Sequence, residues 1–376
     1  MALIERSLHR AVVLSVAVFV AGFSATGFGQ PCQIAPETVT AVGITTDQEA
    51  EISRCVRENA ADLTSADAAK RRASRLALLR PLENSGASAN FRFAYARALI
   101  STLESALQST DDRVAVNALV VAGDVATDST TSLLIASLKS DRPALRYDAA
   151  YGLRRTFEAM VRSAPAVNPD NIGIAINALR DRTAVESDGQ VLKACVAALL
   201  AATDVPSNHA PTARADATAA LCVGLGTHVK GASGKAAEPA VLDAYLKGVD
   251  GVRIVLARPG IAITATEAKA ACELSGRCAA YGVRILRSKG LAAGESESRE
   301  VLSNTIAASE TLLGQAALSL SAGVLRLPRR DLGDKFSRAV DVNSEVVFIN
   351  EASAVVGSEG LLSKPPFDFP KGHFLP

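Results

Sequence analysis

The six cysteines have the most distinctive chemistry in this sequence, and they lie at Cys32, Cys55, Cys195, Cys222, Cys272 and Cys278. An even number of cysteines in a chain that enters an oxidising compartment is typical of disulfide bonding. Because they are close in sequence, Cys32 and Cys55 are expected to bridge the N-terminal leader to the first helix. The alternative is that all six are buried thiols that act as small apolar side chains.

The other two possible bridges depend on how helices are placed. Cys195 and Cys222 lie on consecutive helices at about the same distance from the hairpin midpoint, within roughly one turn, so a bridge is geometrically reasonable. Cys272 and Cys278 would be roughly 9 Å apart along an unbroken helix and on different faces. A glycine is well suited to end a helix, so the sequence favours a break at Ser275-Gly276; without it the two cysteines do not pair.

No other residue pattern predicts catalysis or metal binding. A zinc site could be drawn from Cys195, Cys222, His209 and His228, but their spacing matches no zinc motif. Motifs for a serine nucleophile, a phosphate-binding loop or a dinucleotide are absent from the sequence. Asp111 and Asp112 are interpreted as helix caps rather than paired catalytic carboxylates. We therefore expect no metal and no cofactor, and we favour a role other than catalysis, with a Cys–His nucleophile left open.

The N-terminus has the three regions of a secretory signal peptide. Arg6, His9 and Arg10 precede an apolar run from Ala11 to Phe23, and small residues follow up to Gly29. The run of 13 residues is too short to span a bilayer. We predict a signal peptide at 1–29 and a periplasmic or secreted mature protein without a transmembrane segment.

The composition favours an all-α protein. Hydrophobic residues make up 48% of the 376 residues, yet aromatic residues are only 4% and Trp is absent. Small apolar side chains let helices approach closely, whereas a sheet core would contain more β-branched and aromatic residues. The formal net charge of +1 gives no electrostatic reason to expect a nucleic-acid partner.

Apolar residues at helical spacing, separated by polar turns, predict a series of helix pairs. The pairs span 47–61 with 65–82, 91–108 with 113–126, 130–139 with 143–160, 170–180 with 188–202, 212–227 with 238–256, and 266–288 with 297–322. Within them, 252–256 could instead be a strand, and Gly290 is expected to end the preceding helix as a C′ residue. The leader, 31–45, is expected to be irregular and exposed.

The second and third pairs are sequence repeats. Placing Asp112-Arg113 on Asp141-Arg142 gives an offset of 29 residues, at which Gly123 coincides with Gly152. In the turn Ser140-Asp141-Arg142-Pro143, Asp141 can cap the following helix and Pro143 can open it. Paired helices at a period near 30 are typical of a solenoid.

This turn, followed by Leu145-Arg146, resembles a HEAT repeat of the short bacterial, PBS-lyase type, most clearly over residues 91–160. Asn117 departs from the pattern, because it stands where the next copy has Arg146. The resemblance implies a right-handed α-solenoid of paired antiparallel helices over 30–328, with the second helix of each pair on the concave side. It also implies that Arg146 either contacts a neighbouring repeat, the role we favour, or faces a ligand.

On that side the candidate partner-binding residues are Arg113, Asn117, Tyr147, Tyr151, Arg154 and Arg155, because Tyr and Arg are enriched at binding hot spots.

The remaining region, 329–376, is predicted to contain a cap helix at 329–340, an ambiguous segment at 342–356 and a tail from 364 onwards. We expect Phe367, Phe369 and Phe374 to pack back on the last repeat. The alternative is a docking arm for a partner.

Three functions remain open. The first is an exported scaffold that binds a protein or peptide through the concave face. The second, implied by the resemblance, is a maturation enzyme similar to HEAT-repeat phycobilin lyases, although the signal peptide argues against such cytoplasmic chemistry. The third is a structural component of a cell-envelope assembly.

Overall fold

The computed structural model describes residues 32–291 and 295–375. The predicted signal peptide, 1–29, lies outside them. The regular elements of these described residues are fifteen α-helices and two short 3-10 helices, with no strand. The segment 342–356 is therefore helical, and the helix containing 252–256 continues to Leu256. The protein is an all-α solenoid, as the sequence predicts.

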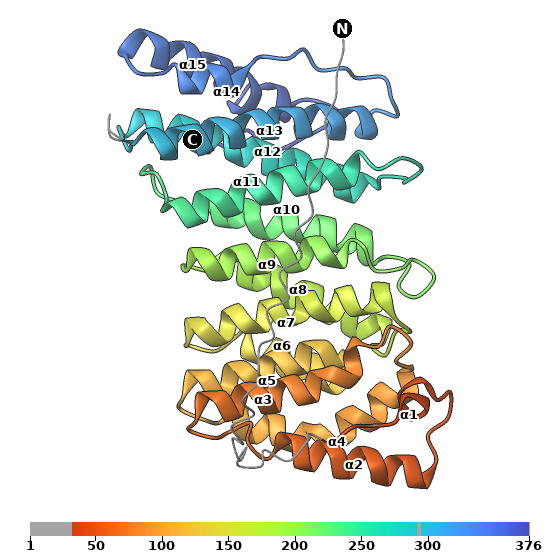
Figure 1. Ribbon diagram of the computed structural model, residues 1–376. Coiled ribbons are helices and arrows are strands. Elements are labelled where there is room, and N and C mark those ends of the chain that lie inside the picture. Colours follow the sequence, from red (N-terminus) through yellow and green to blue (C-terminus); the bar gives the residue numbers. More distant parts are fainter. Residues whose placement is uncertain (1–31, 292–294, 376) are drawn as a thin grey trace, which may run out of the picture. The chain divides into compact units, whose positions relative to one another are not determined.

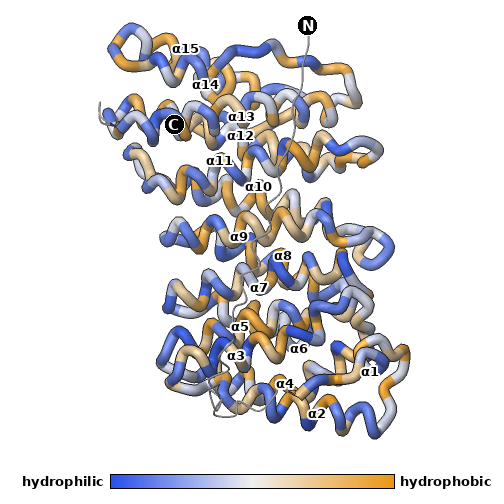
Figure 2. Tube along the Cα trace, in the orientation of Figure 1, coloured by the Kyte–Doolittle hydropathy of each residue, from blue (hydrophilic) through white to orange (hydrophobic). Residues whose placement is uncertain are grey.

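The predicted pairs form two layers of helices (Figure 1). The first helices of the pairs pack on one another and are called the even layer: α2 (Thr46–Ala60), α4 (Ala89–Leu107), α6 (Asp128–Ser137), α8 (Pro169–Val185), α10 (Ala213–Gly231) and α12 (Ala265–Arg287). The second helices form the odd layer: α3 (Ala68–Leu79), α5 (Asp112–Val125), α7 (Pro143–Arg162), α9 (Gly189–Ala202), α11 (Pro239–Leu256) and α13 (Ser296–Leu320). Hydrophilic and hydrophobic residues alternate along the helices (Figure 2), as expected for helices with one buried face.

The repeat-equivalent glycines mark the closest approach within the odd layer. A Cβ on Gly123 of α5 would lie 2.7 Å from the Cα of Gly152 on α7, so the two backbones touch where the sequence repeats. The Thr156 hydroxyl on α7 donates to the Gly123 carbonyl at 3.1 Å. The 29-residue offset therefore identifies a real structural equivalence, and glycine is required there because of the neighbouring backbone.

Of three helix ends predicted from the sequence, one is formed by the expected residue and two are formed by a neighbouring residue. Asp111 caps α5 as predicted, by accepting from the Arg113 N–H. The N-cap of α7, however, is Arg142 rather than Asp141, with Pro143 in the first turn. At the end of α12 the left-handed residue is Lys289, with φ 53°, and Gly290 follows it. Gly290 is glycine because a Cβ would overlap the backbone of Gly234.

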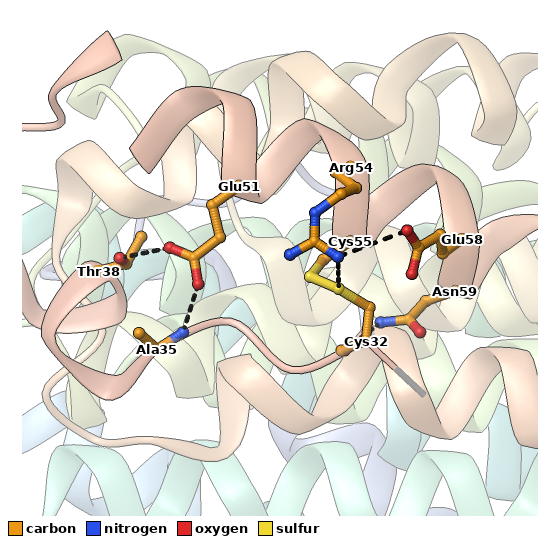
Figure 3. Close-up of a disulfide and its surroundings, with 8 residues drawn as sticks. All are labelled: Cys32, Ala35, Thr38, Glu51, Arg54, Cys55, Glu58 and Asn59. Carbon is orange, nitrogen blue, oxygen red and sulfur yellow. Dashed lines mark hydrogen bonds and ion pairs between the residues drawn. A yellow bond between two sulfur atoms is a disulfide. The ribbon is translucent and has the colours of Figure 1, made fainter. Parts of the chain in front are cut away.

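The leader, expected to be irregular and exposed, is packed in part, although residues such as Val42 and Gly43 remain exposed. It contains α1 (Pro36–Thr40), and Thr38 and Val39 are buried. Cys32 and Cys55 form the predicted disulfide, with Cα atoms 5.0 Å apart (Figure 3). The Asn59 side chain also donates to the Cys32 carbonyl at 2.9 Å. Glu51 of α2 accepts from the Ala35 N–H and the Thr38 hydroxyl at 2.9 and 2.8 Å.

The other proposed disulfides are wrong, because Cys195, Cys222, Cys272 and Cys278 are buried free thiols. Cys195 faces Thr183 of α8, whereas Cys222 faces Cys272 of α12. The predicted bridge between these consecutive helices is therefore absent, and the two thiols have different neighbours. The expected break at Gly276 is also absent, so Cys272 and Cys278 remain on different faces of α12.

The C-terminal region covers the end of both layers. After α13 the chain forms α14 (Leu332–Ser337), α15 (Val342–Val356) and η2 (Leu361–Ser363). Phe367, Phe369 and Phe374 are all buried, as expected for a tail that packs back. The Phe374 ring occupies the space above Gly276, where a Cβ would lie 2.5 Å from the ring. Gly276 therefore serves the tail and does not end α12.

By length and composition alone, one described segment, 342–363, could cross a membrane. The expectation that the mature protein has no transmembrane segment therefore stays a prediction. The segment is not one continuous helix, because α15 ends at Val356. Composition does not separate a bilayer span from a packed helix, and Phe348, Val355 and Val356 pack into the protein core.

Candidate functional site

Two tyrosines form an exposed aromatic surface on α7. Tyr147 and Tyr151 lie one turn apart, and their rings are stacked with planes within 4° and centroids 6.4 Å apart. Tyr147 is 39% exposed. Such flat amphipathic rings give a partner a large contact area at a low entropic cost.

Arg154 and Arg155 surround this pair, as the sequence predicts. Their guanidinium carbons lie 6.0 and 5.9 Å from the centre of the Tyr151 ring, within cation–π distance. Arg154 donates to Glu158 at 2.7 Å, and Arg155 is paired with Asp124 of α5 at 2.5 Å. Four of the six candidate residues are therefore grouped on one face of α7.

The other two candidates have different surroundings. Asn117 is buried, and its side-chain oxygen accepts from Arg75 of α3 at 2.9 Å, so it joins α3 to α5. Arg113 is exposed near the start of α5, and no described hydrogen bond or ion pair joins its side chain to the tyrosines. Asn117 thus has a packing role, and the tyrosine group does not depend on Arg113.

A groove of about 910 Å³ crosses the odd layer beside the tyrosine group, over α7, α9 and α11. Its apolar lining includes Val161 and Ile254, each 52% exposed, and Leu200. Gly251 gives Leu200 room to lie over α11, because a Cβ there would be 2.6 Å from the Leu200 methyl groups. The rim is charged and contains Arg154, Glu158, Arg162, Asp204 and Arg258. An apolar floor with a charged rim is suited to an extended or helical peptide segment.

A second apolar groove, of about 510 Å³, lies on the even layer between α6 and α8. Ile174 is exposed within it to almost the same extent as Ile254 in the first groove, 54% against 52%. No aromatic residue lines either groove. It is a matched alternative surface against which the odd-layer groove can be tested.

Arg146 has the structural role that we favour. It forms a buried two-contact ion pair with Glu186 in the α8–α9 turn, with both distances 2.8 Å. It also donates to the carbonyls of Ser140 and Asp141 at 3.0 Å. Burial by itself would raise the pKa of Glu186, but hydrogen bonds from Arg146 and from the Asp188 N–H hold that pKa below its usual value.

Arg71 repeats the same turn contact near the start of the chain. It donates to the carbonyls of Ser65 and Ala66, which lie six and five residues before it, as Ser140 and Asp141 lie before Arg146. The arginine therefore joins a helix to the turn that precedes it in two separate repeats. Neither arginine is available to a ligand, since both are buried.

Of the residues considered for metal or nucleophile chemistry, the cysteines are buried, and His209 and His228 are partly buried. Among the described residues, no three His, Cys, Asp or Glu side chains gather as metal ligands. The two ring nitrogens of His228 lie within hydrogen-bonding distance of the Tyr245 hydroxyl and the Glu186 carbonyl. Burial raises the pKa of Cys195 and Cys272 to about 12, so these thiols are neutral and poorly nucleophilic at neutral pH.

Sequence reasoning missed Val161 and Ile254, which form the exposed floor of the groove. Helical spacing could have predicted the exposure of Ile254, because it lies outside the buried face of α11 that contains Val252 and Val255. It also missed a polar pocket around Arg92 and Asp124. No sequence signal predicts this pocket, since its walls come from separate segments of the chain.

Comparison with known proteins supplies no relative that identifies the chain. No family model matches the sequence, and no curated protein matches it. Among solved structures, one similar chain is an engineered protein of the Northeast Structural Genomics Consortium, 17% identical with a TM-score of 0.34, over 68% of this chain and 97% of its own. A second engineered protein of that consortium is 16% identical with a TM-score of 0.29, over 85% of this chain and 92% of its own.

Proposed function

We propose that this chain is an exported HEAT-like repeat protein that binds a protein or peptide segment across its odd layer. The observation that carries the proposal is the groove over α7, α9 and α11 with its apolar floor. Arg154, which lines the groove, also lies over the Tyr151 ring and so connects the groove to the Tyr147–Tyr151 pair. Apolar side chains that are half exposed in a concave surface gain free energy when a partner covers them. The Cys32–Cys55 disulfide supports export, because such bonds persist in oxidising compartments.

The charged rim would determine which segment binds and how it is aligned. Arg154 is paired with Glu158 at 2.7 Å, and Arg258 with Asp204 at 2.7 Å, so both signs of charge alternate around the apolar floor. Exposed ion pairs of this kind contribute little to stability and can exchange partners on binding. A bound segment with apolar residues at the centre and mixed charges at its ends fits this arrangement.

The test begins with a photo-cross-linking amino acid at Ile254 in the exported protein in its native host. Mass spectrometry of the cross-linked product identifies the partner segment, which is then made as a synthetic peptide. We expect the peptide to bind the purified protein, and Ile254→Glu to weaken binding at least about tenfold, because the charge would be buried.

Ile174→Glu is the matched control, since Ile174 has the same residue type and nearly the same exposure in the groove of the even layer. It should leave the affinity unchanged. The proposal is wrong if Ile174→Glu abolishes binding and Ile254→Glu does not, because the partner would then occupy the even layer. A Tyr147→Ala/Tyr151→Ala variant measures the contribution of the aromatic pair.

A further inference from the structure

A polar pocket of about 250 Å³ lies behind α7, on the side away from the groove of α9 and α11. Its walls come from α4, α5, the C-terminal end of α7 and the segment 79–85. Three arginines line it, namely Arg92, Arg155 and Arg162. Arg162 also lines the groove, so the two cavities meet at the end of α7.

Two arginines of this pocket have buried Nε–H donors without acceptors. Arg92 is 3% exposed, and its terminal nitrogens donate to the carbonyls of Asp124 and Val125 and to the Ser163 hydroxyl. Its Nε has no partner, and neither does the Nε of Arg155. Buried donors are nearly always satisfied, so two orphans on the wall of one cavity indicate an acceptor inside or beside it.

The charges of the pocket are also unbalanced. Three guanidinium groups face the Asp124 carboxylate, which is paired with Arg155, and Glu83, which is exposed at the rim. Arg162 takes part in no hydrogen bond or ion pair with another described residue. Burial lowers the pKa of Arg92, and the charge of Arg162 lowers it further, while Asp124 raises it. Arg162 is exposed, so its unpaired charge is solvated, but the net positive charge of the lining favours the binding of an anion.

We infer that this pocket binds an oxyanion, either a carboxylate or a phosphate. The oxygens of such a group accept hydrogen bonds from guanidinium nitrogens in the planar geometry that arginine favours. A water molecule would satisfy a donor, but it would leave the excess of positive charge unchanged. The inference stands apart from the proposed function, because a free anion tests it without any peptide.

The test follows the Nε–H resonances of Arg92 and Arg155 by NMR while inorganic phosphate is added at constant ionic strength. We expect saturable shifts of both resonances. Arg162→Gln should weaken the affinity about tenfold, because it removes one charged donor. Arg162 is exposed and forms no described contact, so this variant is expected to fold, and its unfolding temperature without phosphate checks this.

Arg97→Gln is the control. Arg97 lies on α4 five residues after Arg92, is 71% exposed and does not line the pocket. This variant removes the same charge and should bind phosphate as the wild type does. The inference is overturned if the Nε–H resonances do not shift. It is also overturned if both variants weaken the affinity equally, because phosphate binding would then depend only on the net charge of the protein.

A second arm distinguishes the sources of the oxyanion. A short peptide with a free C-terminal carboxylate is compared with the same peptide amidated. If only the carboxylate form displaces phosphate, the pocket receives the carboxylate of a peptide. If neither form does, the pocket receives a free anion such as phosphate. Ile254→Glu should leave phosphate binding unchanged, so failure of the groove proposal and failure of the pocket are distinguishable.

Discussion

Two helix-interior glycines, Gly123 in the middle of the stack and Gly276 near its C-terminal end, have opposite surroundings. The space beside Gly123 is filled by the backbone of α7 at Gly152. The space beside Gly276 is filled by side chains, the ring of Phe374 and a methyl group of Leu362. Within the repeats, equivalent positions of neighbouring helices meet. At the end there is no further repeat, so a tail from the same chain covers the exposed face.

The ion pairs differ between the same two regions. In the middle, Glu186 is fully buried between Arg146 and Arg182, at 2.8 Å from each. At the end, Glu273 is 37% exposed, accepts from Arg277 at 3.1 Å and lies 2.9 Å from the Nε2 of His373. The comparison indicates that the middle depends on close backbone contact and buried charge compensation, whereas the end depends on adaptable aromatic side chains.

The largest predicted effect compares the two carboxylates. Glu186→Gln should lower the free energy of unfolding by about 3 kcal/mol, because it leaves the buried guanidinium of Arg146 and the partly buried one of Arg182 without their counter-charge. Glu273→Gln should cost about 1 kcal/mol, because solvent screens its half-exposed pair. Denaturant unfolding of both variants measures the difference. Equal losses would show that the two regions do not differ in this respect.

The same pair of variants has a pH signature. The pKa of Glu186 is held below its usual value in the folded protein, so its contribution is present at neutral pH and is lost as the pH falls through that lowered pKa. The gap between wild type and Glu186→Gln should therefore narrow in acid. A gap that is constant down to pH 3 would contradict this assignment.

The next effect concerns the glycines. Gly123→Ala should cost about 2 kcal/mol, because the new Cβ meets backbone atoms that cannot move without shifting α7. Gly276→Ala should cost a similar amount in the wild type but at least about 1 kcal/mol less in a Phe374→Ala background, where the ring is gone. Thermal or denaturant unfolding of the four variants measures this coupling.

The control for the glycine series is Gly173→Ala on α8, where nothing lies within 4 Å of the added Cβ. That substitution should stabilise the protein by about 0.5–1 kcal/mol, because alanine is the better helix former. If Gly123→Ala were equally well tolerated, the close α5–α7 contact would not exist in solution.

The smallest predicted effect concerns Asp148, a carboxyl group in the middle of the stack that forms no ion pair with another described residue. Burial raises the pKa of Asp148 on α7 to about 6, and the charge of Arg75 offsets this only in part. A carboxyl group with a raised pKa lowers the free energy of unfolding only when it must ionise. The contribution of Asp148 to stability is therefore complete below about pH 4 and is lost as the pH rises through 6. The Asp148→Asn variant should therefore be as stable as the wild type near pH 4. At pH 8 its free energy of unfolding should be about 1 kcal/mol higher than that of the wild type.

Asp243→Asn gives the opposite sign and serves as the control. A hydrogen bond from Lys193 holds the pKa of Asp243 below its usual value. Its loss should slightly destabilise the protein at neutral pH and have no effect in acid. Unfolding temperatures measured from about pH 2 to pH 8 test both variants, because the effect of Asp243→Asn disappears only as the pH falls through the lowered pKa of Asp243. A stabilisation by Asp148→Asn that is independent of pH would count against the raised pKa of Asp148.

The helices themselves follow from the sequence. Apolar spacing, polar turns and caps such as Asp111 placed every predicted pair, because these signals act within a few residues. The same local reasoning placed Tyr147 and Tyr151 on one face, since helical geometry fixes residues one turn apart. The 29-residue offset also identified Gly123 and Gly152 as equivalent, and the structure brings them into contact.

Tertiary structure decided what each helix face meets. Cys195 and Cys222 lie on consecutive helices but remain free thiols, and Gly276 accommodates Phe374 from almost a hundred residues away instead of ending α12. The groove and the arginine pocket combine side chains from helices that are distant in the sequence. Local pattern fixes the helix and its buried stripe, whereas the rotation and partner of each helix depend on packing between distant segments.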